Sequence, residues 1–225
     1  MQLNEIYTID YSQPAEYRFS LDSIFLAQRV ADWMFLRQIQ PQNIADLCSG
    51  CGVVGLELLF HLNRRDGLSP DLIDFIEIQD EYRPHFEKNK SAMKNLFRSR
   101  TELKLIVENY QNLLDHPEGR GRYDLIVSNP PYFRTDQGKL SPSDFKNRCR
   151  FFVDSDFLHL INWISYSLSK NGSAFLLMRE DADAKSAKPL SEIAAQNNLG
   201  LEILDDVRGT QLIRLYLFRN YADIV

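Results

Sequence analysis

The tetrad Asn129-Pro130-Pro131-Tyr132 combines residue types that could act on a nitrogen atom. Two successive prolines remove backbone donors and stiffen the turn, so nearby carbonyls stay free to accept hydrogen bonds. The Asn129 side chain adds another acceptor, and Tyr132 offers a flat apolar face for a planar group. Acceptors on both hydrogens of an NH2 group stabilise the positive charge that develops as its nitrogen attacks an electrophile. These four residues are therefore predicted to be catalytic, and no strongly basic residue is required before the transfer.

A glycine-rich turn, Asp46-Leu47-Cys48-Ser49-Gly50-Cys51-Gly52, is a candidate ligand site. Glycines after a strand let the backbone approach a ligand closely, and the helix that follows points its free amide donors at that ligand. With Gly55, the turn also fits the G-x-G-x-x-G pattern of dinucleotide-binding proteins. Glu77 ends the next predicted strand, where its carboxylate can accept hydrogen bonds from two ribose hydroxyls. The turn and Glu77 are therefore predicted to bind a cofactor that contains a nucleoside.

Asp46 distinguishes between two cofactors that such a turn could hold. Its carboxylate would repel a pyrophosphate, whereas it would attract a ligand that carries an ammonium and a sulfonium. A sulfonium methyl donor is therefore favoured. A nicotinamide-dependent oxidoreductase remains an alternative from another enzyme class, although it leaves Asn129 to Tyr132 unexplained and no His or Tyr arrangement for hydride transfer is visible.

Cys48 and Cys51 form a C-x-x-C pair at the predicted start of a helix, a position that could lower a thiol pKa. The glycines already account for the turn, so we interpret the pair as structural. No metal is expected, because Cys149 and the four scattered histidines offer no second paired spacing of ligands.

Periodicity predicts the elements that must position these motifs. Apolar residues recur at helical spacing from Asp22, and later segments alternate between strand and helix before a hairpin at Gly209-Thr210. Residues 134–150 are polar and charged, so they are predicted to form a long loop. The predicted strands are 44–48, 72–78, 103–107, 123–128, 173–179, 201–208 and 211–219, and later helices are predicted at 110–116, at 156–169 with Gly172 as terminator, and near 189–198 ending at Gly200.

This order predicts an α/β fold with a doubly wound, mostly parallel seven-stranded sheet and a C-terminal antiparallel hairpin. Ligands in such sheets bind beyond the carboxyl ends of the strands, where both motifs fall. We expect one domain overall, in which residues 1–40 form a lead-in and a helix packed on the core, and residues 41–225 form the cofactor-binding domain.

Length and composition set limits on the function. The chain has 225 residues, 44% of them hydrophobic, and a net charge of -5, which argues against a surface that coats nucleic acid non-specifically. Three cysteines are too few for a disulfide framework. We expect no signal peptide, no membrane span and a cytoplasmic location, with a monomer as the default state.

Asp46 to Gly52, Glu77 and Asn129 to Tyr132 together resemble the motifs of class I (Rossmann-like) methyltransferases that modify nitrogen, over most of residues 20–219. The resemblance implies S-adenosyl-L-methionine as cofactor, with its ribose bound by Glu77. Asn109 matches the position that usually holds an acidic contact to the adenine of the donor, and an amide can still bond that edge. The methionine part of the donor would be surrounded by Asp46, Ser49, Gly50 and Gly52.

Within this class, the chain most resembles the bacterial tRNA1(Val) adenine-37 N6-methyltransferases. Tyr17 to Ala27 is similar to their lead-in, an aromatic stretch followed by Asp-Ser and an apolar helix. Phe133 directly after the tetrad, and a loop with two arginines, are also similar. The chain departs from the family where Cys48 replaces the first glycine of the donor loop, and where Asn147-Arg148-Cys149-Arg150 replaces an Ala-Arg-His-Glu-like stretch.

The resemblance implies that the substrate is the exocyclic N6 of an adenine in tRNA. The segment from Arg134 to Arg150 carries five basic and two acidic residues, a net charge of +3, and could contact phosphates. Phe133 and Tyr132 would stack a base that has left its own stack. Phe133, Arg148 and Arg150 are therefore predicted to bind substrate.

Two other substrates remain open. Methyltransferases acting on a protein glutamine amide use the same corner, but they usually carry a separate helical domain, and about 40 residues before the first predicted strand leave no room for it. A DNA adenine is also possible, although we find no target-recognition domain in the sequence.

Overall fold

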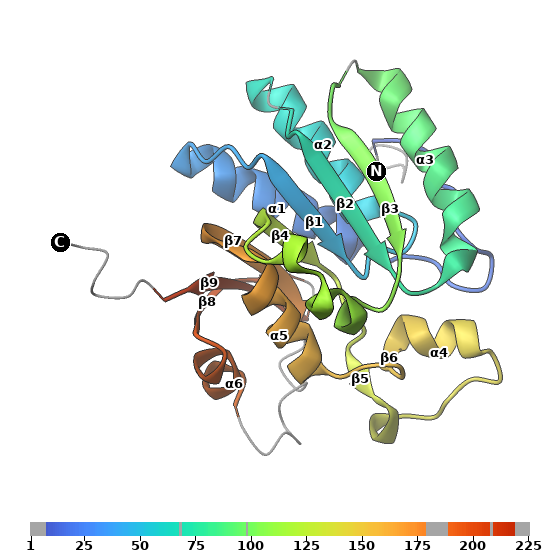
Figure 1. Ribbon diagram of the computed structural model, residues 1–225. Helices are drawn as coiled ribbons and strands as arrows, with labels where there is room; N and C mark the ends of the chain where they lie inside the picture. The colour runs from blue at the N-terminus through green and yellow to red at the C-terminus, as the bar shows by residue number, and fades with distance from the viewer. Residues whose placement is uncertain (1–7, 68, 98, 179–188, 208, 219–225) are drawn as a thin grey trace.

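The computed structural model describes residues 8–67, 69–97, 99–178, 189–207 and 209–218. Seven strands form one sheet in the order β3-β2-β1-β4-β7-β9-β8 (Figure 1). Strands β1 to β4 and β7 run parallel, whereas β9 pairs antiparallel with both β7 and β8. The predicted doubly wound sheet with a C-terminal antiparallel hairpin is thereby confirmed. The strands are β1 (Asn43–Leu47), β2 (Leu72–Glu77), β3 (Glu102–Val107), β4 (Tyr123–Ser128), β7 (Leu168–Met178), β8 (Leu199–Val207) and β9 (Thr210–Leu217).

Helices cover both faces of the sheet, and each face has its own apolar core (Figure 1). Successive residues of a strand point to opposite faces, so Ile44 of β1 joins one core while Ala45 and Leu47 join the other. The first core contains α1 (Leu21–Arg37), α2 (Val53–Asp66) and α3 (Arg83–Leu96), and the second contains α5 (Phe157–Ser167) and α6 (Leu190–Gln196).

The register of the central strands brings the two predicted motifs to one edge. Leu47 at the end of β1 pairs with Ser128 at the end of β4, and the Ser128 hydroxyl donates a hydrogen bond to the Leu47 carbonyl at 2.7 Å. Leu47 also pairs with Ile76 of β2, one residue before Glu77. The glycine turn, Glu77 and Asn129 therefore leave the sheet side by side, as expected for parallel strands that end at the same edge.

The prediction of a continuous loop over residues 134–150 is wrong. The segment contains a short parallel pairing of β5 (Phe133–Arg134) with β6 (Phe151–Phe152), a 3-10 turn (Thr135–Gln137) and helix α4 (Asp144–Arg150). The Ser143 hydroxyl caps α4 by accepting a hydrogen bond from the Lys146 amide. Asn147 is buried and bonds the backbone of Ser141 with both ends of its amide, at 2.7 and 2.9 Å. Hydrogen bonds between polar side chains and the backbone of the same segment explain why it is ordered although it has few apolar residues.

Two glycines predicted to end helices lie within strands instead. A Cβ at Gly172 of β7 would approach the Tyr123 carbonyl oxygen to 2.9 Å, and a Cβ at Gly200 of β8 would approach the Tyr216 ring to 2.5 Å. Helix α5 instead ends at Ser167, and α6 ends at Gln196, before Asn198 adopts a left-handed φ of 60°. Both glycines therefore allow close packing between strands rather than helix termination.

Candidate active site

A cavity opens at the carboxyl edge of β1, β2 and β4, and it brings most of the predicted site residues together. One wall comes from the glycine turn and the end of β2, and another from the tetrad that follows β4. The segment after α4 and part of the N-terminal lead-in complete it. The lining includes Gln13, Tyr17, Phe19, Ser23, residues 48–51, 76–79 and 129–133, Glu108, Tyr110 and residues 148–155.

The glycine turn depends on left-handed backbone conformations. Gly50 has a φ of 53° and Gly52 a φ of 86°, both of which favour glycine. Gly50 and Ser49 line the cavity, whereas Gly52 lies behind it at the start of α2, where a Cβ would approach the Phe86 ring to 2.8 Å. Cys48 also has a left-handed φ of 59°, a backbone conformation that favours glycine.

Asp46 lies beneath the turn and is completely buried. Its Oδ2 accepts a hydrogen bond from the Gly55 amide at 2.8 Å, while Oδ1 has no partner within the described part of the chain. Burial raises the pKa of this carboxyl to about 7. Gly55 permits the contact, because a Cβ there would approach the Phe75 ring to 2.6 Å. A buried acid with one unbonded oxygen favours a positive charge above it.

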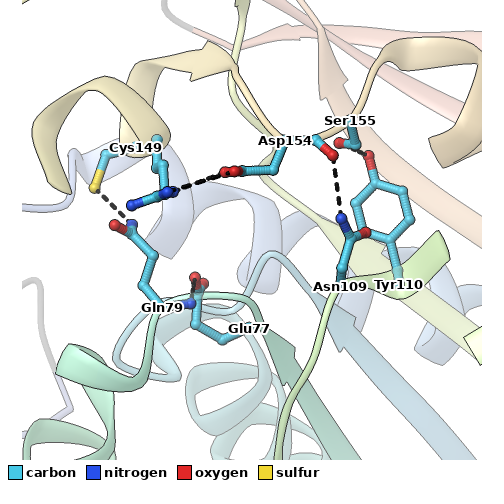
Figure 2. Close-up of polar contacts among 8 residues, drawn as sticks. Glu77, Gln79, Asn109, Tyr110, Cys149, Asp154 and Ser155 are labelled. Carbon is cyan, nitrogen blue, oxygen red and sulfur yellow. Dashed lines mark hydrogen bonds and ion pairs between the residues drawn. The ribbon is translucent and has the colours of Figure 1, made fainter. Parts of the chain in front are cut away.

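Glu77 is buried at the end of β2 and faces the cavity. Its carboxylate accepts a hydrogen bond from the Gly50 amide at 2.8 Å. It accepts another from the Gln79 amide at 2.9 Å, and Figure 2 shows Glu77 beside Gln79. Burial raises the pKa of Glu77, and these backbone donors oppose the rise. A carboxylate has about four acceptor sites, so the two oxygens can still receive further hydrogen bonds from a ligand.

Asn109 is turned away from the cavity, although its neighbours Glu108 and Tyr110 line it. The Asn109 side chain accepts a hydrogen bond from the Gln111 amide at 3.0 Å and donates one to the Asp154 carbonyl at 3.1 Å. Figure 2 shows this contact beside the hydrogen bond between the Tyr110 and Ser155 hydroxyls. Asn109 and Tyr110 therefore fasten residues 154–155, which form one wall, to the end of β3.

Tyr110 was missed by sequence reasoning. A buried aromatic residue just after β3 could have indicated a cavity wall, because such a position lies at the ligand-binding edge of the sheet.

The predicted basic segment is partly neutralised by nearby carboxylates. Arg148 Nε donates to Asp154 Oδ2 at 2.7 Å, a contact that raises the pKa of Arg148, and Arg134 pairs with Asp136 at 3.2 Å. The Arg150 guanidinium lies over the rings of Phe133 and Phe151, 5.9 and 5.5 Å from their centroids. Arg148, Arg150 and Phe133 all line the cavity.

The tetrad begins where β4 ends, and its four residues line the cavity. Asn129 Nδ2 donates a hydrogen bond to the Ser23 hydroxyl at 3.0 Å, and Asn129 Oδ1 accepts one from the Tyr132 hydroxyl. Ser23 lies in the first turn of α1 and is 5% exposed. The sequence contained Ser23 within the conspicuous lead-in, but a contact between residues so far apart in the chain has no local signature.

Three free cysteines border the site, and none has the properties of a reactive thiolate. Burial raises the pKa of Cys51 to about 12 and raises those of Cys48 and Cys149 as well. Cys149 Sγ lies 3.4 Å from Gln79 Nε2 and 3.2 Å from the Tyr82 hydroxyl.

Within the described ranges, no group of three or more His, Cys, Asp or Glu residues could hold a metal ion. The described helices also include none that is long and apolar enough to cross a membrane.

Comparison with known proteins agrees with this geometry. The chain matches the model of the Eco57I restriction-modification methylase family over residues 4–211. A relative from Christiangramia forsetii, named tRNA1(Val) (adenine(37)-N6)-methyltransferase, is 27% identical over 210 residues, 88% of this chain and 79% of that protein. A release factor glutamine methyltransferase from Clostridium botulinum is 29% identical over 104 residues, 45% of this chain and 32% of that protein.

Among solved structures, the T. thermophilus 16S rRNA N2 G1207 methyltransferase in complex with AdoMet and guanosine is similar, with a TM-score of 0.60 at 15% identity. The match covers 91% of this chain and 45% of that one, and it shows the fold. The relative from Christiangramia forsetii confirms the resemblance predicted from the sequence. Because the family model spans more than half of the chain, this protein belongs to the Eco57I restriction-modification methylase family.

Proposed function

We propose that this protein is an S-adenosyl-L-methionine-dependent methyltransferase of the cytoplasm that methylates the exocyclic N6 of an adenine in tRNA, at position 37 of tRNA1(Val). The observation that carries the proposal is the single cavity shared by the glycine turn, Glu77 and Asn129. A donor held by the first two would place its reactive group beside the acceptor supplied by the third. The relative from Christiangramia forsetii supports the choice of substrate.

The chain fits the proposed donor at two positions. Among the described residues, one buried oxygen of Asp46 has no hydrogen-bond partner, which favours the positive charge of the methionine part. The other neighbours of that part would be Ser49, Gly50 and Gly52. Glu77 keeps acceptor capacity for the ribose hydroxyls. The donor supplies a methyl group on a positively charged sulfur. Asn109 would act on the donor's adenine indirectly, because it fastens residues 154–155, the cavity wall beside which the adenine would lie.

The tetrad would hold and orient the target nitrogen. A planar base can stack on Tyr132 and Phe133, while Asn129 Oδ1 and a backbone carbonyl of the proline pair accept hydrogen bonds from its NH2 group. A bound S-adenosyl-L-methionine would supply its methyl group to the nitrogen lone pair, and the electrons of the broken carbon–sulfur bond would return to its sulfur. Asn129 Oδ1 would stabilise the positive charge on nitrogen until one proton is lost to solvent. The chain therefore stabilises developing charge and supplies alignment rather than a strong base.

A protein glutamine amide is the second candidate, because it presents the same NH2 geometry and the Clostridium botulinum relative carries that name. The family name also makes DNA a necessary comparison. The substrate assay therefore has three arms: labelled S-adenosyl-L-methionine is incubated separately with unmodified tRNA, with DNA and with cell protein.

Label recovered from tRNA as N6-methyladenosine would support the proposal, and fractionated tRNAs would then identify tRNA1(Val). Label in protein alone, or in DNA alone, would exclude tRNA as the substrate but would still support the proposed methyl transfer. The Asn129→Ala variant should transfer label about 10²–10³-fold more slowly than the wild type in the arm that the wild type labels. Asn95→Ala, an exposed change on α3, is the matched control that should behave as the wild type.

A further inference from the structure

Ser23 is joined to the tetrad by a hydrogen bond across 106 residues of sequence. Its hydroxyl lies in the first turn of α1, borders the cavity and accepts a hydrogen bond from Asn129 Nδ2 at 3.0 Å. The side chain is almost completely buried. Breaking this contact would leave the half-buried NH2 group of Asn129 without this partner, which costs more than the loss of a fully exposed hydrogen bond.

The contact matters because an asparagine side chain that is held at one end keeps its amide plane, and with it the direction of its other end, in place. A serine hydroxyl can accept or donate a hydrogen bond, so Ser23 holds this plane through its position rather than through its polarity. With Nδ2 held by Ser23, Oδ1 is directed to the opposite side, where it receives the Tyr132 hydroxyl.

The two partners of Asn129 have different relations to a substrate. The Tyr132 hydroxyl bonds Oδ1, and an amide oxygen has a second lone pair that a target NH2 group can use. Ser23 bonds the other end of the amide and need not be displaced. The Ser23 contact can therefore persist through binding and transfer, holding the amide plane while a substrate binds on the reacting side.

We infer that Ser23 is a positioning residue for methyl transfer: its hydroxyl anchors one end of the Asn129 amide and so holds the amide plane in place, with the other end toward the target nitrogen. This inference rests on the proposed function of the tetrad and adds a residue from α1 to the site. The hydroxyl group is what the role requires, so threonine should replace serine and alanine should not.

The test compares Ser23→Ala and Ser23→Thr with the wild type. The matched control is Ser167→Ala, which removes another buried hydroxyl, one at the end of α5 that borders no described part of the cavity. Ser23→Ala should lower kcat roughly tenfold, the effect of one hydrogen bond, with the affinity for S-adenosyl-L-methionine unchanged. Ser23→Thr should restore most of kcat. Unchanged kcat in Ser23→Ala, or equal losses in the alanine and threonine variants, would overturn the inference.

A spectroscopic readout keeps this test separate from the proposed substrate. The side-chain NH2 signals of Asn129, assigned by their absence in Asn129→Ala, should shift and exchange faster with solvent in Ser23→Ala but not in Ser167→Ala. Signals that do not change would overturn the inference without any assay of activity. The kinetic comparison uses whichever acceptor the wild type labels, so a failure of tRNA as substrate contradicts the proposed function and leaves the Ser23 test intact.

Discussion

The Gly50 amide donates a hydrogen bond to Glu77 Oε2 at 2.8 Å, and this contact joins the turn after β1 to the end of β2. The same carboxylate also accepts from the Gln79 amide. Two neighbouring strand ends are thus linked through one buried acid, which is also the proposed ribose acceptor. The shape of the turn and the binding of the donor therefore depend on the same side chain.

Replacing Glu77 should weaken donor binding more than it changes the fold. Glu77→Ala removes the proposed contacts to two ribose hydroxyls and the partner of the Gly50 amide, so the donor Kd should rise about a hundredfold, since each hydrogen bond to a charged group contributes roughly 1.5–3 kcal/mol. Calorimetric titration with S-adenosyl-L-methionine measures this change. Glu102→Gln, at the exposed opposite end of β3, is the control. An unchanged Kd in Glu77→Ala would remove the ribose assignment.

Asp46 should make donor binding depend on pH. Its pKa of about 7 means that the carboxyl is largely neutral at pH 6 and largely charged at pH 8 in the ligand-free protein. If the charged form attracts the donor, the association constant should rise with pH, by up to about tenfold for each pH unit below the pKa. Titrations between pH 5.5 and about 7.5 should show this rise in the wild type, and a flat profile in Asp46→Asn. Parallel profiles would show that Asp46 does not attract the donor.

The same group gives a second signature, in stability. The folded pKa of about 7 lies above the ordinary value of 3.8 for an aspartate, so the folded state holds a proton that the unfolded chain releases. The free energy of unfolding of the wild type should therefore fall, relative to that of Asp46→Asn, as pH rises from about 4 to about 7. Denaturant unfolding of ligand-free protein at both ends of this window checks the sign. A free energy of unfolding that rises with pH in the wild type, relative to Asp46→Asn, would contradict the raised pKa.

Asn129 should affect catalysis and not donor affinity. Removing its amide takes away one acceptor aimed at the developing positive charge, and loss of one such preorganised contact lowers kcat about 10²–10³-fold. The donor Kd should stay near that of the wild type, because the glycine turn and Glu77 are intact. Single-turnover transfer and calorimetry on the same preparation of Asn129→Ala separate the two quantities. Turnover like that of the wild type would exclude the proposed role.

The sequence could predict the sheet and the edge where the site lies, because strand periodicity and glycines after a strand are local patterns. It could not predict the uses of Gly172 and Gly200, whose close neighbours Tyr123 and Tyr216 come from other parts of the chain. Helix α4 was missed for a similar reason. Its seven residues are too short for a clear apolar period, and its capping contacts come from serines that are also common in loops.

The site also had a part that local sequence patterns predict and a part that they do not. Motif residues next to strand ends fell where predicted, since parallel strands share one edge. The partners that hold those residues lie far away in the sequence: Ser23 for Asn129, and Asp154 for Asn109. Only the folded chain shows that the Asn109 amide fastens a cavity wall, or that Asp154 neutralises Arg148.

Asn109 should control the wall formed by residues 154–155. Asn109→Ala removes the hydrogen bond to the Asp154 carbonyl, so backbone amides near this segment should exchange faster with solvent in the ligand-free protein. Hydrogen exchange followed by mass spectrometry measures the effect. Asn112→Ala, an exposed change on the same 3-10 turn, is the control. Unaltered exchange at residues 153–156 would show that Asn109 does not fasten the wall and would remove its proposed role beside the donor's adenine.

Arg150 should contribute to RNA binding more than Arg148 does. Arg148 is held by Asp154 at 2.7 Å, so its charge is already balanced, whereas Arg150 lies over two aromatic rings that leave its charge available to a phosphate. Arg150→Gln should therefore raise the KM for RNA and reduce the dependence of KM on salt, with the donor Kd unchanged. Arg148→Gln should raise the KM less, and Arg120→Gln, an exposed change before the amino end of β4, should have no effect. Equal effects of Arg150→Gln on RNA and on the donor would indicate a distorted cavity instead of a lost phosphate contact.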